Sequence, residues 1–363
     1  TNQQRAMGLC HSATEDDERN KEINKQLKTE KRQAAAMQKV LLLGSGESGK
    51  STVFKQIQTL YRRPYTEEEL MKFAFIIRSN IFEAITTLVD MHGTFLEAGT
   101  IETDLSSDEL KEGAHELHQL QEEQEFGIDE HLATIIEGLW RDPAIQEVFK
   151  LRSEFQFNDT SAYFFDRLQD ISQPSYVPTF DDALRSRVRT TGATVIDFEM
   201  DGQPVQFVDV GGQKSERTKW IHQFEGVQVI LFITAVSDYD RGMYEDEKVN
   251  RMHDSMNLFE NIVNMEWFSS STVVLFLNKS DLFEEKIKRV PLSRAFPEWD
   301  DSKQDLEEIY EYIGQQFLKR IEDESKDMVL HVTCATDTKA IQVVFDAIKH
   351  LIISSNLEFV GLQ

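Results

Sequence analysis

Residues 44–51 have the pattern of a loop that holds phosphate groups. The stretch GSGESGKS fits G-x-x-x-x-G-K-S, and it follows the short apolar run 40–43, which is typical of a buried strand. Its glycines let successive backbone N–H groups point at phosphate oxygens, and the helix expected over about 50–60 adds a favourable dipole at its N-terminus. Lys50 would supply a positive charge to the β- and γ-phosphates, and the Ser51 hydroxyl can ligate Mg²⁺.

A second motif, NKSD at 278–281, would select the base of a nucleotide. It follows the expected strand 272–277, at the edge where ligands bind in open α/β sheets. The carboxylate of Asp281 can accept two hydrogen bonds from the N1–H and 2-amino group of guanine, whereas adenine offers no such pair. Because an unpaired buried carboxylate is costly, such a site rejects the wrong base strongly. A pattern of only four residues is weak evidence for a base-binding site. The evidence comes from the position of the motif, which follows a predicted strand downstream of the phosphate loop.

A third motif, DVGGQ at 209–213, closes the expected strand 203–208. Asp209 could hold Mg²⁺ through water, Gly212 could offer its N–H to a γ-phosphate, and Gln213 could orient a water molecule. If the chain had no phosphate loop, the same residues would indicate only an aspartate that caps a loop and glycines that form a turn.

The elements that must position these motifs alternate between strands and helices. Strands are expected at 194–200 and 203–209, joined by the hairpin turn Asp201-Gly202, and at 227–235, 272–277 and 328–334. Helices are expected at about 240–264, 303–320 and 338–354. This alternation predicts a mainly parallel sheet that is covered on both faces.

One long insertion interrupts that pattern. From Pro64 to about Phe180 no strand is evident, and apolar residues recur at helical spacing, as at positions 70, 73, 74, 77, 81, 85 and 88. The stretch 97–130 is strongly acidic. These features predict an all-helical module with a solvated acidic face, and Pro174 and Pro178 mark its end.

The composition excludes several classes of protein. The chain has 363 residues and a formal net charge of −25, which argues against a general nucleic-acid binder. No apolar run reaches about 18 residues, so we expect no membrane-spanning helix. The two cysteines, Cys10 and Cys334, lie far apart, and they predict neither a disulfide framework nor a CxxC zinc site.

The first 39 residues leave two interpretations open. Residues 15–39 are charged almost all round, and Ile23 and Leu27 form one narrow apolar stripe, so the segment is either a solvated arm or a helix that docks on a partner. Gly8 fits an N-myristoylation signal and Cys10 a neighbouring palmitoylation site. Gly8 can be acylated only as the N-terminal residue, so we interpret residues 1–6 as a cloning remnant.

The ordered set GSGESGKS, RTTG (189–192), DVGGQ, NKSD and TCAT (333–336) resembles the α subunits of heterotrimeric G proteins. Two features separate the chain from small Ras-like GTPases. Lys50 and Thr190 lie about 140 positions apart, which leaves room for the inserted helical domain of the α subunits. The stretch 184–192 also resembles their first switch, in which Arg187 would be the arginine finger and Thr190 a Mg²⁺ ligand. The α subunits are themselves the standard example of an arginine finger supplied within the chain.

The resemblance implies a three-part architecture of class α/β. A Ras-like P-loop GTPase domain with a six-stranded, mainly parallel sheet would comprise 40–66 and 184–363. An all-α helical domain would be inserted at 67–183, and an N-terminal helix would lie within 1–39.

The resemblance also implies the residues of the site. Gln213 and Arg187 would be catalytic, with Glu47 pairing with Arg187. Mg²⁺ would be bound by Ser51 and Thr190, and by Asp209 through water. The nucleotide would be bound by Glu47, Ser48, Gly49, Lys50, Ser51, Thr52, Asp159, Thr160, Leu184, Arg185, Gly212, Asn278, Lys279, Asp281, Cys334, Ala335 and Thr336.

The implied function is a switch that binds GTP and GDP with Mg²⁺, hydrolyses GTP slowly and transduces receptor signals to effectors. The implied partners are a βγ dimer on the N-terminal helix and the second switch, a seven-helix receptor at the C-terminal tail, and RGS proteins and effectors on the switches. No nucleic acid is expected as a partner. Lipid groups would place the chain at the cytoplasmic face of the plasma membrane.

Three alternatives are weighed against this function. NKSD speaks against an ATP-driven enzyme, and Gln213 and Arg187 speak against a scaffold that holds nucleotide permanently. A GTPase that signals without receptors remains open.

The role of Asp281 generates the first prediction. Asp281→Asn should shift the preference from guanine to xanthine nucleotides, because the 2-position of xanthine is a carbonyl that an amide N–H can meet. Competition of GTP and XTP for labelled GDP measures this preference. Normal GTP binding with no response to XTP would contradict the role of Asp281.

Overall fold

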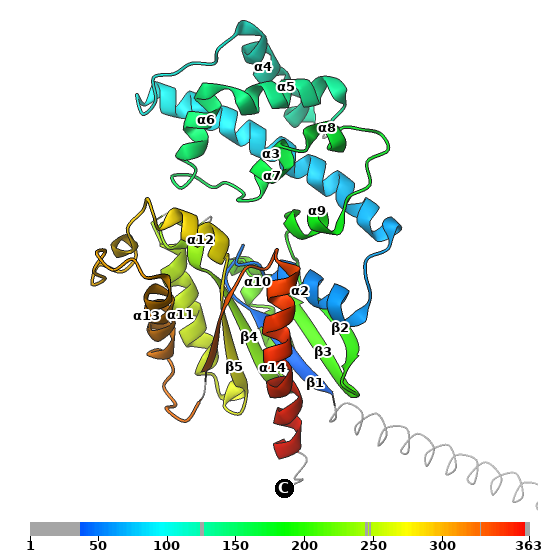
Figure 1. The fold of residues 1–363 in the computed structure, drawn as a ribbon, viewed down its shortest axis with the longest axis vertical. Helices are drawn as coiled ribbons and strands as arrows, with labels where there is room; N and C mark the ends of the chain where they lie inside the picture. The colour runs from blue at the N-terminus through cyan, green and yellow to red at the C-terminus, as the bar shows by residue number, and fades with distance from the viewer. Residues whose placement is uncertain (1–36, 124–126, 244–245, 247, 327, 360–363) are drawn as a thin grey trace, which may run out of the picture.

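The computed structural model describes residues 37–123, 127–243, 246, 248–326 and 328–359. Figure 1 shows a sheet flanked by helices and, above it, a separate group of helices. The expectations for residues 1–36, including the N-terminal helix and the acylation of Gly8 and Cys10, lie outside the described residues.

The sheet has six strands in the order β2-β3-β1-β4-β5-β6. Only β2 and β3 pair antiparallel; the other neighbours are parallel. This confirms the predicted hairpin and mainly parallel sheet. The bounds are β1 Gln38–Leu43, β2 Ala193–Met200, β3 Gln203–Val210, β4 Val227–Ala235, β5 Thr272–Asn278 and β6 Met328–Thr333. Leu42 of β1 pairs with Asp209 of β3, so the phosphate loop and DVGGQ leave the sheet at the same level.

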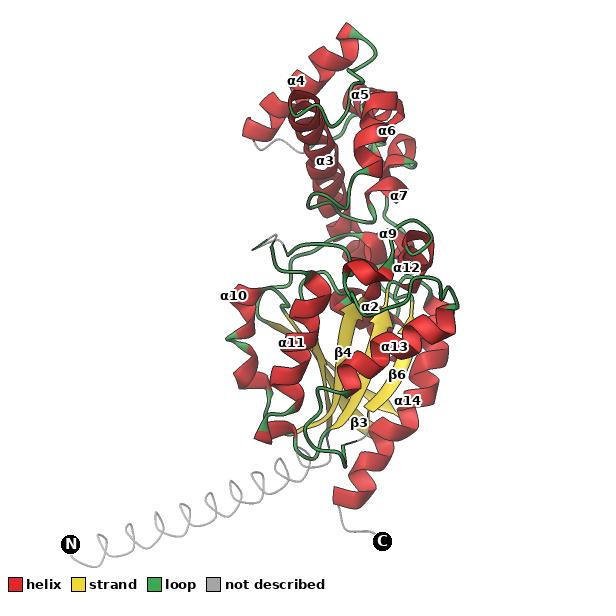
Figure 2. Ribbon diagram, turned by 90° about the vertical axis from the view of Figure 1, so that its left-hand side faces the viewer, coloured by secondary structure: helices red, strands yellow, loops and turns green. Residues whose placement is uncertain are grey.

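Helices cover both faces of the sheet (Figures 1 and 2). The bounds are α2 Lys50–Ile57, α14 Thr338–Phe359, α11 Arg251–Val263 and α13 Leu306–Leu318. Alternate side chains of β1 enter two cores: Leu41 and Leu43 pack with α11 and α13, whereas Val40 and Leu42 pack with α2 and α14. Burial on both faces is the reason that β1 reads as a continuous apolar run.

Short elements fill the connections. They are η1 Gln58–Arg62, α10 Lys214–Arg217, η2 Trp220–Gln223, η3 Val236–Asp238, η4 Glu266–Phe268, α12 Ser280–Lys286 and η5 Leu292–Arg294. The helix predicted over about 50–60 covers the first residues of η1. The sequence pattern does not predict the others, because each is too short to show a helical period.

The helix predicted over 240–264 is wrong in its first half. The described residues between Asp240 and Asn250 form no helix, and α11 begins at Arg251. Asn250 ends the preceding loop as the N-cap, because its side chain accepts hydrogen bonds from the backbone N–H groups of Met252 (2.8 Å) and His253 (3.2 Å). Asparagine is among the strongest N-cap residues. The helix therefore starts after Asn250, although the preceding residues also have a helical pattern.

All the regular elements in the described part of the insertion are helices, as predicted. Its bounds are α3 Glu67–Glu97, α4 Asp108–Glu123, α5 Glu130–Arg141, α6 Pro143–Lys150, α7 Ser161–Phe165, α8 Leu168–Ile171 and α9 Phe180–Arg185. Thr66 and Glu69 form a capping box that starts α3. Buried side chains such as Ile81, Phe82 and Ile136 give this group a core of its own. We call it the helical unit and the rest the sheet unit. The domain limits stay predictions, and α9 runs across the expected limit at 183/184.

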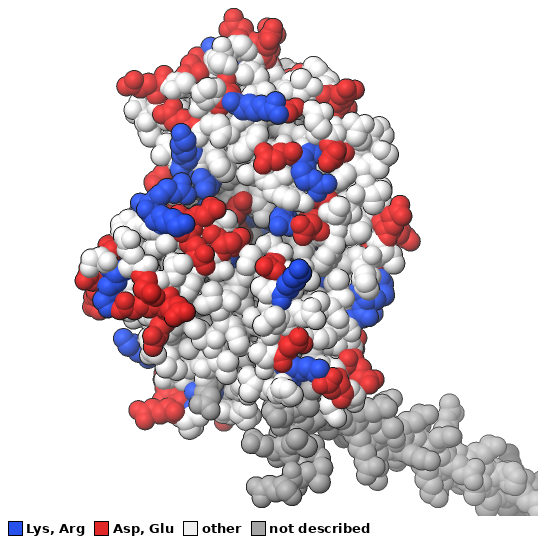
Figure 3. Space-filling model, in the orientation of Figure 1, with Lys and Arg blue, Asp and Glu red and all other residues white. Residues whose placement is uncertain are grey.

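The described surface mixes charges of both signs. On the face in Figure 3, acidic side chains are spread from top to bottom, and basic ones gather near the level at which the two units meet. Within the described residues, none of the helices combines the length and the apolar character needed to cross a membrane.

Two phenylalanines of α3 test the packing of the helical unit. Phe82 is fully buried, whereas Phe75 is 65% exposed. Phe82→Ala should lower the free energy of unfolding by about 3–5 kcal/mol because it leaves a cavity. Phe75→Ala, the matched control on the same helix, should change it by less than about 0.5 kcal/mol. Urea unfolding followed by circular dichroism measures both. Equal effects would contradict this description of the core.

Candidate nucleotide and metal site

A cavity of about 550 Å³ lies between the two units, at the carboxyl ends of β1 and β5. Most of the predicted site residues line it: Glu47, Gly49, Lys50, Ser51, Thr52, Asp159, Thr160, Leu184, Arg185, Arg187, Thr190, Gly212, Gln213, Asn278, Lys279, Asp281, Cys334, Ala335 and Thr336. Two others lie just behind the lining: Ser48 is fully buried within the phosphate loop, and Asp209 is buried against Ser51.

The phosphate loop has the backbone of an anion cradle. Glu47 and Gly49 have φ angles of 63° and 100°, in the left-handed region that turns consecutive N–H groups inward. A Cβ atom at Gly49 would collide with the Asn278 side chain. The Asn278 amide donates to the Ser48 carbonyl oxygen at 2.8 Å, and so the NKSD motif fixes the phosphate loop directly.

Lys50 is the buried positive charge of this cradle. Its Nζ donates to the carbonyl oxygens of Ser45 (2.7 Å) and Gly44 (3.1 Å). Burial lowers the pKa of Lys50 to about 8, although the carboxylate of Asp209 acts in the opposite direction. A Cβ atom at Gly212 would collide with Nζ, so glycine at this position leaves room for the lysine.

The oxygen atoms beside Lys50 fit a magnesium ion. Ser51 Oγ lies 2.7 Å from Thr190 Oγ1 and donates to Asp209 Oδ2 at 2.7 Å. Asp209 Oδ1 is buried, with no hydrogen-bond partner among the described residues. Burial raises the pKa of Asp209, and Lys50 opposes this. Two hydroxyls and a carboxylate are the hard oxygen donors that Mg²⁺ prefers.

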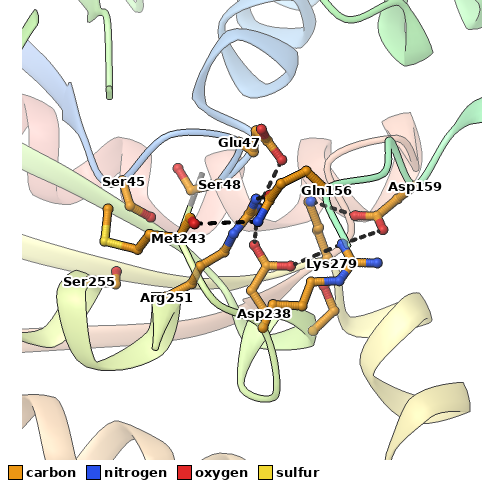
Figure 4. A network of polar contacts seen from close by, with 12 residues as sticks. Ser45, Glu47, Ser48, Gln156, Asp159, Asp238, Met243, Arg251, Ser255 and Lys279 are labelled. Carbon is orange, nitrogen blue, oxygen red and sulfur yellow. Dashed lines mark hydrogen bonds and ion pairs between the residues drawn. The ribbon is translucent and has the colours of Figure 1, made fainter. Parts of the chain in front are cut away.

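Arg187 reaches the cavity from the segment before Thr190. Its guanidinium donates to Glu47 Oε1 at 2.6 Å, as the resemblance implies. The other oxygen of Glu47 accepts a hydrogen bond from Arg251 at 2.9 Å. Arg251 also pairs with Asp238 and donates to Gln156 of the helical unit, as Figure 4 shows.

Asp159 ties the helical unit to the sheet unit. Its two oxygens accept from Lys279 and Arg241, both at 2.8 Å. Burial alone would raise the pKa of Asp159, but Lys279 and Arg241 outweigh it and hold that pKa far below its usual range. This carboxylate is therefore charged and doubly paired across the boundary between the units.

The far end of the cavity is built around Asn278. Its Oδ1 accepts from the Ala335 backbone N–H (2.9 Å) and from Thr333 Oγ1 (3.2 Å). Gln56 of α2 donates to the Ala335 carbonyl oxygen at 3.0 Å. These bonds hold the TCAT segment next to NKSD, and Asp281 lines the same end.

Several functional side chains were not predicted. The cavity is also lined by Lys55, Asn80, Glu83, Tyr163 and Leu282, which belong to none of the predicted motifs. Five further lining residues, Gly46, Asn158, Ser186, Val188 and Arg189, lie within or next to the predicted motifs. Arg241 and Arg251 flank the loop that was predicted as helix, and the N-cap signal of Asn250 could have revealed it. The sequence gives only a weak indication that Asn80 is a site residue, namely that it is a polar residue at the edge of the apolar stripe of α3.

The sequence model of one protein family, G-protein alpha subunit, matches residues 17–352. The chain belongs to this family. It is also 41% identical over 362 residues to the guanine nucleotide-binding protein alpha-17 subunit of Caenorhabditis elegans, a match that covers 98% of this chain and all of that protein. The family and the fold class predicted from the motifs are thus confirmed.

The ion pairs across the boundary differ in burial, and a comparison of two of them gives a prediction for this G-protein alpha subunit. Arg241→Leu removes a buried partner of Asp159, and loss of a buried ionic contact is costly. Release of labelled GDP should speed up by at least about tenfold, or about 1.4 kcal/mol. The matched control is Arg294→Leu, because Arg294 lies 3.8 Å from Glu154 with both side chains about half exposed. Such a pair contributes about 0–1 kcal/mol. Equal release rates in both variants would show that the buried pair does not hold the units closed.

Proposed function

We propose that the chain is a guanine-nucleotide-dependent signalling switch that binds GTP and GDP with Mg²⁺ and hydrolyses GTP slowly. The observation that carries this proposal is the convergence of three motifs on one cavity. Lys50 and the Ser51 and Thr190 hydroxyls lie at the phosphate end, and Asp281 lies at the base end. Membership of the family supports the same function.

The sheet unit prepares the phosphates for reaction. Transfer of a phosphoryl group to water needs alignment and neutralisation of charge more than covalent help. The Lys50 ammonium neutralises charge on the β- and γ-phosphates, and the Gly212 N–H can donate to a γ-phosphate oxygen. A bound Mg²⁺, held by Ser51 and Thr190 and by Asp209 through water, would supply further positive charge.

Two side chains act on the reacting groups. Gln213, whose Cγ lies near Gly46 of the phosphate loop, orients the attacking water. Arg187 leaves Glu47 to meet the charge that develops between the β- and γ-phosphates. Because Arg187 belongs to the same chain, hydrolysis needs no arginine from a partner. A helper protein, such as an RGS protein, would steady Gln213 and the loop around Thr190 and Thr191.

The two units enclose the nucleotide, so they must separate before it can leave. Opening breaks the pairs of Asp159 and the bond between Gln156 and Arg251. Spontaneous GDP release is therefore slow, and a receptor at the C-terminal tail would accelerate it. A GTPase that signals without a receptor would show fast release of GDP from the purified chain.

The surface also supports the proposed partners. Residues 215–222 resemble the second switch of the α subunits. Within them Ile221 is 55% exposed, and a βγ dimer or an effector can cover this apolar side chain. Lipid groups on Gly8 and Cys10 would bring the chain to the cytoplasmic face of the plasma membrane.

The catalytic roles give a direct prediction. Gln213→Leu and Arg187→Cys should each keep GTP binding but slow hydrolysis by at least about tenfold, equal to about 1.4 kcal/mol of barrier. The reason is that each removes a group that acts in the transition state and leaves the phosphate cradle intact. Single-turnover hydrolysis of preloaded GTP measures the rate.

If one variant hydrolyses GTP at the wild-type rate, the residue replaced in that variant does not have the catalytic role proposed for it. Wild-type hydrolysis by both variants would favour the nucleotide-holding scaffold. Displacement of labelled GDP by ATP would instead favour the ATP-driven enzyme.

Membrane attachment should need two signals, because one myristoyl chain binds only marginally, with an association constant of about 10⁴ M⁻¹. A version of the protein that begins at Met7 should fractionate with plasma membranes, and Gly8→Ala combined with Cys10→Ser should release it. Each single substitution removes one signal and should weaken the attachment. Retention of the double variant on the membrane would reveal a different anchor.

A further inference from the structure

The segment 183–187, which carries the chain from α9 to Arg187, is held by side chains along its whole length. Each of its five consecutive carbonyl oxygens accepts a hydrogen bond from a side chain. The pairs are Ala183 with Lys55 (2.6 Å), Leu184 with Thr52 (3.4 Å), Arg185 with Thr160 (2.8 Å), Ser186 with Lys55 (3.3 Å) and Arg187 with Asn80 (3.2 Å). The donors come from both units, so the segment is fixed only when the units are closed.

Asn80 makes the most specific of these contacts. Its Nδ2 donates to the Arg187 carbonyl oxygen at 3.2 Å, and its Oδ1 accepts the Arg187 backbone N–H at 2.7 Å. One side chain amide thus bonds to both polar groups of a single residue. This arrangement fixes the peptide groups on both sides of the Arg187 Cα.

The local preferences of α3 do not account for asparagine at this position. Asn80 lies in the middle of a helix of 31 residues, where asparagine is a poorer helix former than alanine. Ile77 and Ala84, one turn before and after it, are buried in the core of the helical unit, whereas Asn80 lines the cavity between the units. A residue that disfavours its own helix is expected where it makes a functional contact.

Among the described residues, the Arg187 side chain, by contrast, forms an ion pair with Glu47 alone. It is 34% exposed, and its guanidinium is held by Glu47. To act in hydrolysis it must exchange that carboxylate for a phosphate oxygen. A fixed backbone restricts where the long side chain can reach, and this lowers the cost of placing the guanidinium in the transition state.

We propose that Asn80 is a positioning residue for GTP hydrolysis: from the helical unit, it fixes the main chain of Arg187 and so aims the guanidinium at the phosphates. This inference rests on the proposed GTPase function. It gives the helical unit a part in the chemistry as well as in the enclosure of the nucleotide.

Single-turnover hydrolysis by the full chain, preloaded with GTP, tests the proposal. Asn80→Ala should fold, because alanine suits the helix better, and should bind GTPγS as the wild type does. Its hydrolysis should be slower by about five- to tenfold, since a misplaced catalytic group costs rate rather than binding. Asn80→Asp, which has the same size and keeps only the acceptor, should also be slower than the wild type.

The double variant Asn80→Ala with Arg187→Cys separates positioning from a general effect. If Asn80 acts through Arg187, the double variant should be no slower than Arg187→Cys alone. Affinity of the GDP-bound chain for tetrafluoroaluminate, a mimic of the transferring phosphoryl group, should fall in Asn80→Ala while GDP affinity is unchanged.

Arg78→Ala is the matched control on the same helix. Arg78 donates to the carbonyl oxygens of Ile171 (3.1 Å) and Gln173 (3.3 Å), both within the helical unit. Its loss should leave the hydrolysis rate unchanged. An equal slowing in Arg78→Ala would show that any loosening of α3 suffices, and this would overturn the proposal.

Wild-type hydrolysis by Asn80→Ala, or a further slowing of Arg187→Cys by the second substitution, would also overturn the positioning role. If Arg187→Cys is slow in those experiments, the proposed GTPase function still stands. If Arg187→Cys hydrolyses at the wild-type rate, both the role of Arg187 and the inference about Asn80 fail together.

Discussion

The buried carboxylate of Asp159 is the constraint on which the rest of the structure depends. It belongs to the helical unit, yet both of its cationic partners, Lys279 and Arg241, belong to the sheet unit. Both ion pairs exist only while the units are closed, so separation of the units must break them. Closure in turn creates the cavity, because residues of both units line it. Lys279 is at the same time part of the base-selecting motif, and enclosure and base selection therefore depend on one cluster of charges.

The phosphate end and the base end of the cavity are not independent sites. Asn278 donates to the phosphate loop at Ser48 and accepts from Ala335 of the TCAT segment. Its side chain is buried, and its three bonds leave it little freedom. A shift of either base loop is therefore transmitted to the backbone that would surround the phosphates. Asn278 acts here as a structural tie, in addition to any contact that it makes with a ligand.

The sheet and most of the site could be predicted because their signals are local. Strands buried on both faces read as apolar runs, and GSGESGKS specifies a backbone shape through its glycines. The loop after β4 could not be predicted in the same way, because Asn250 as a cap competes with a plausible helical pattern. Asn80 and Arg241 were missed for a different reason: their contacts join positions 107 and 82 residues apart. No local period encodes such a pairing, and only the closed arrangement of the units reveals it.

The hydrogen bonds to the five carbonyl oxygens of residues 183–187 restrict which changes the amino-acid sequence of this segment can undergo. The bonds are accepted by backbone carbonyls, and every residue type carries one. These hydrogen bonds therefore constrain the length of the segment and not the types of its side chains. An inserted or deleted residue would turn every later carbonyl away from its donor and move Arg187 by about one residue spacing, 3.8 Å between Cα atoms. Among relatives that share these hydrogen bonds, the number of residues in the segment should be preserved even where its side chains differ.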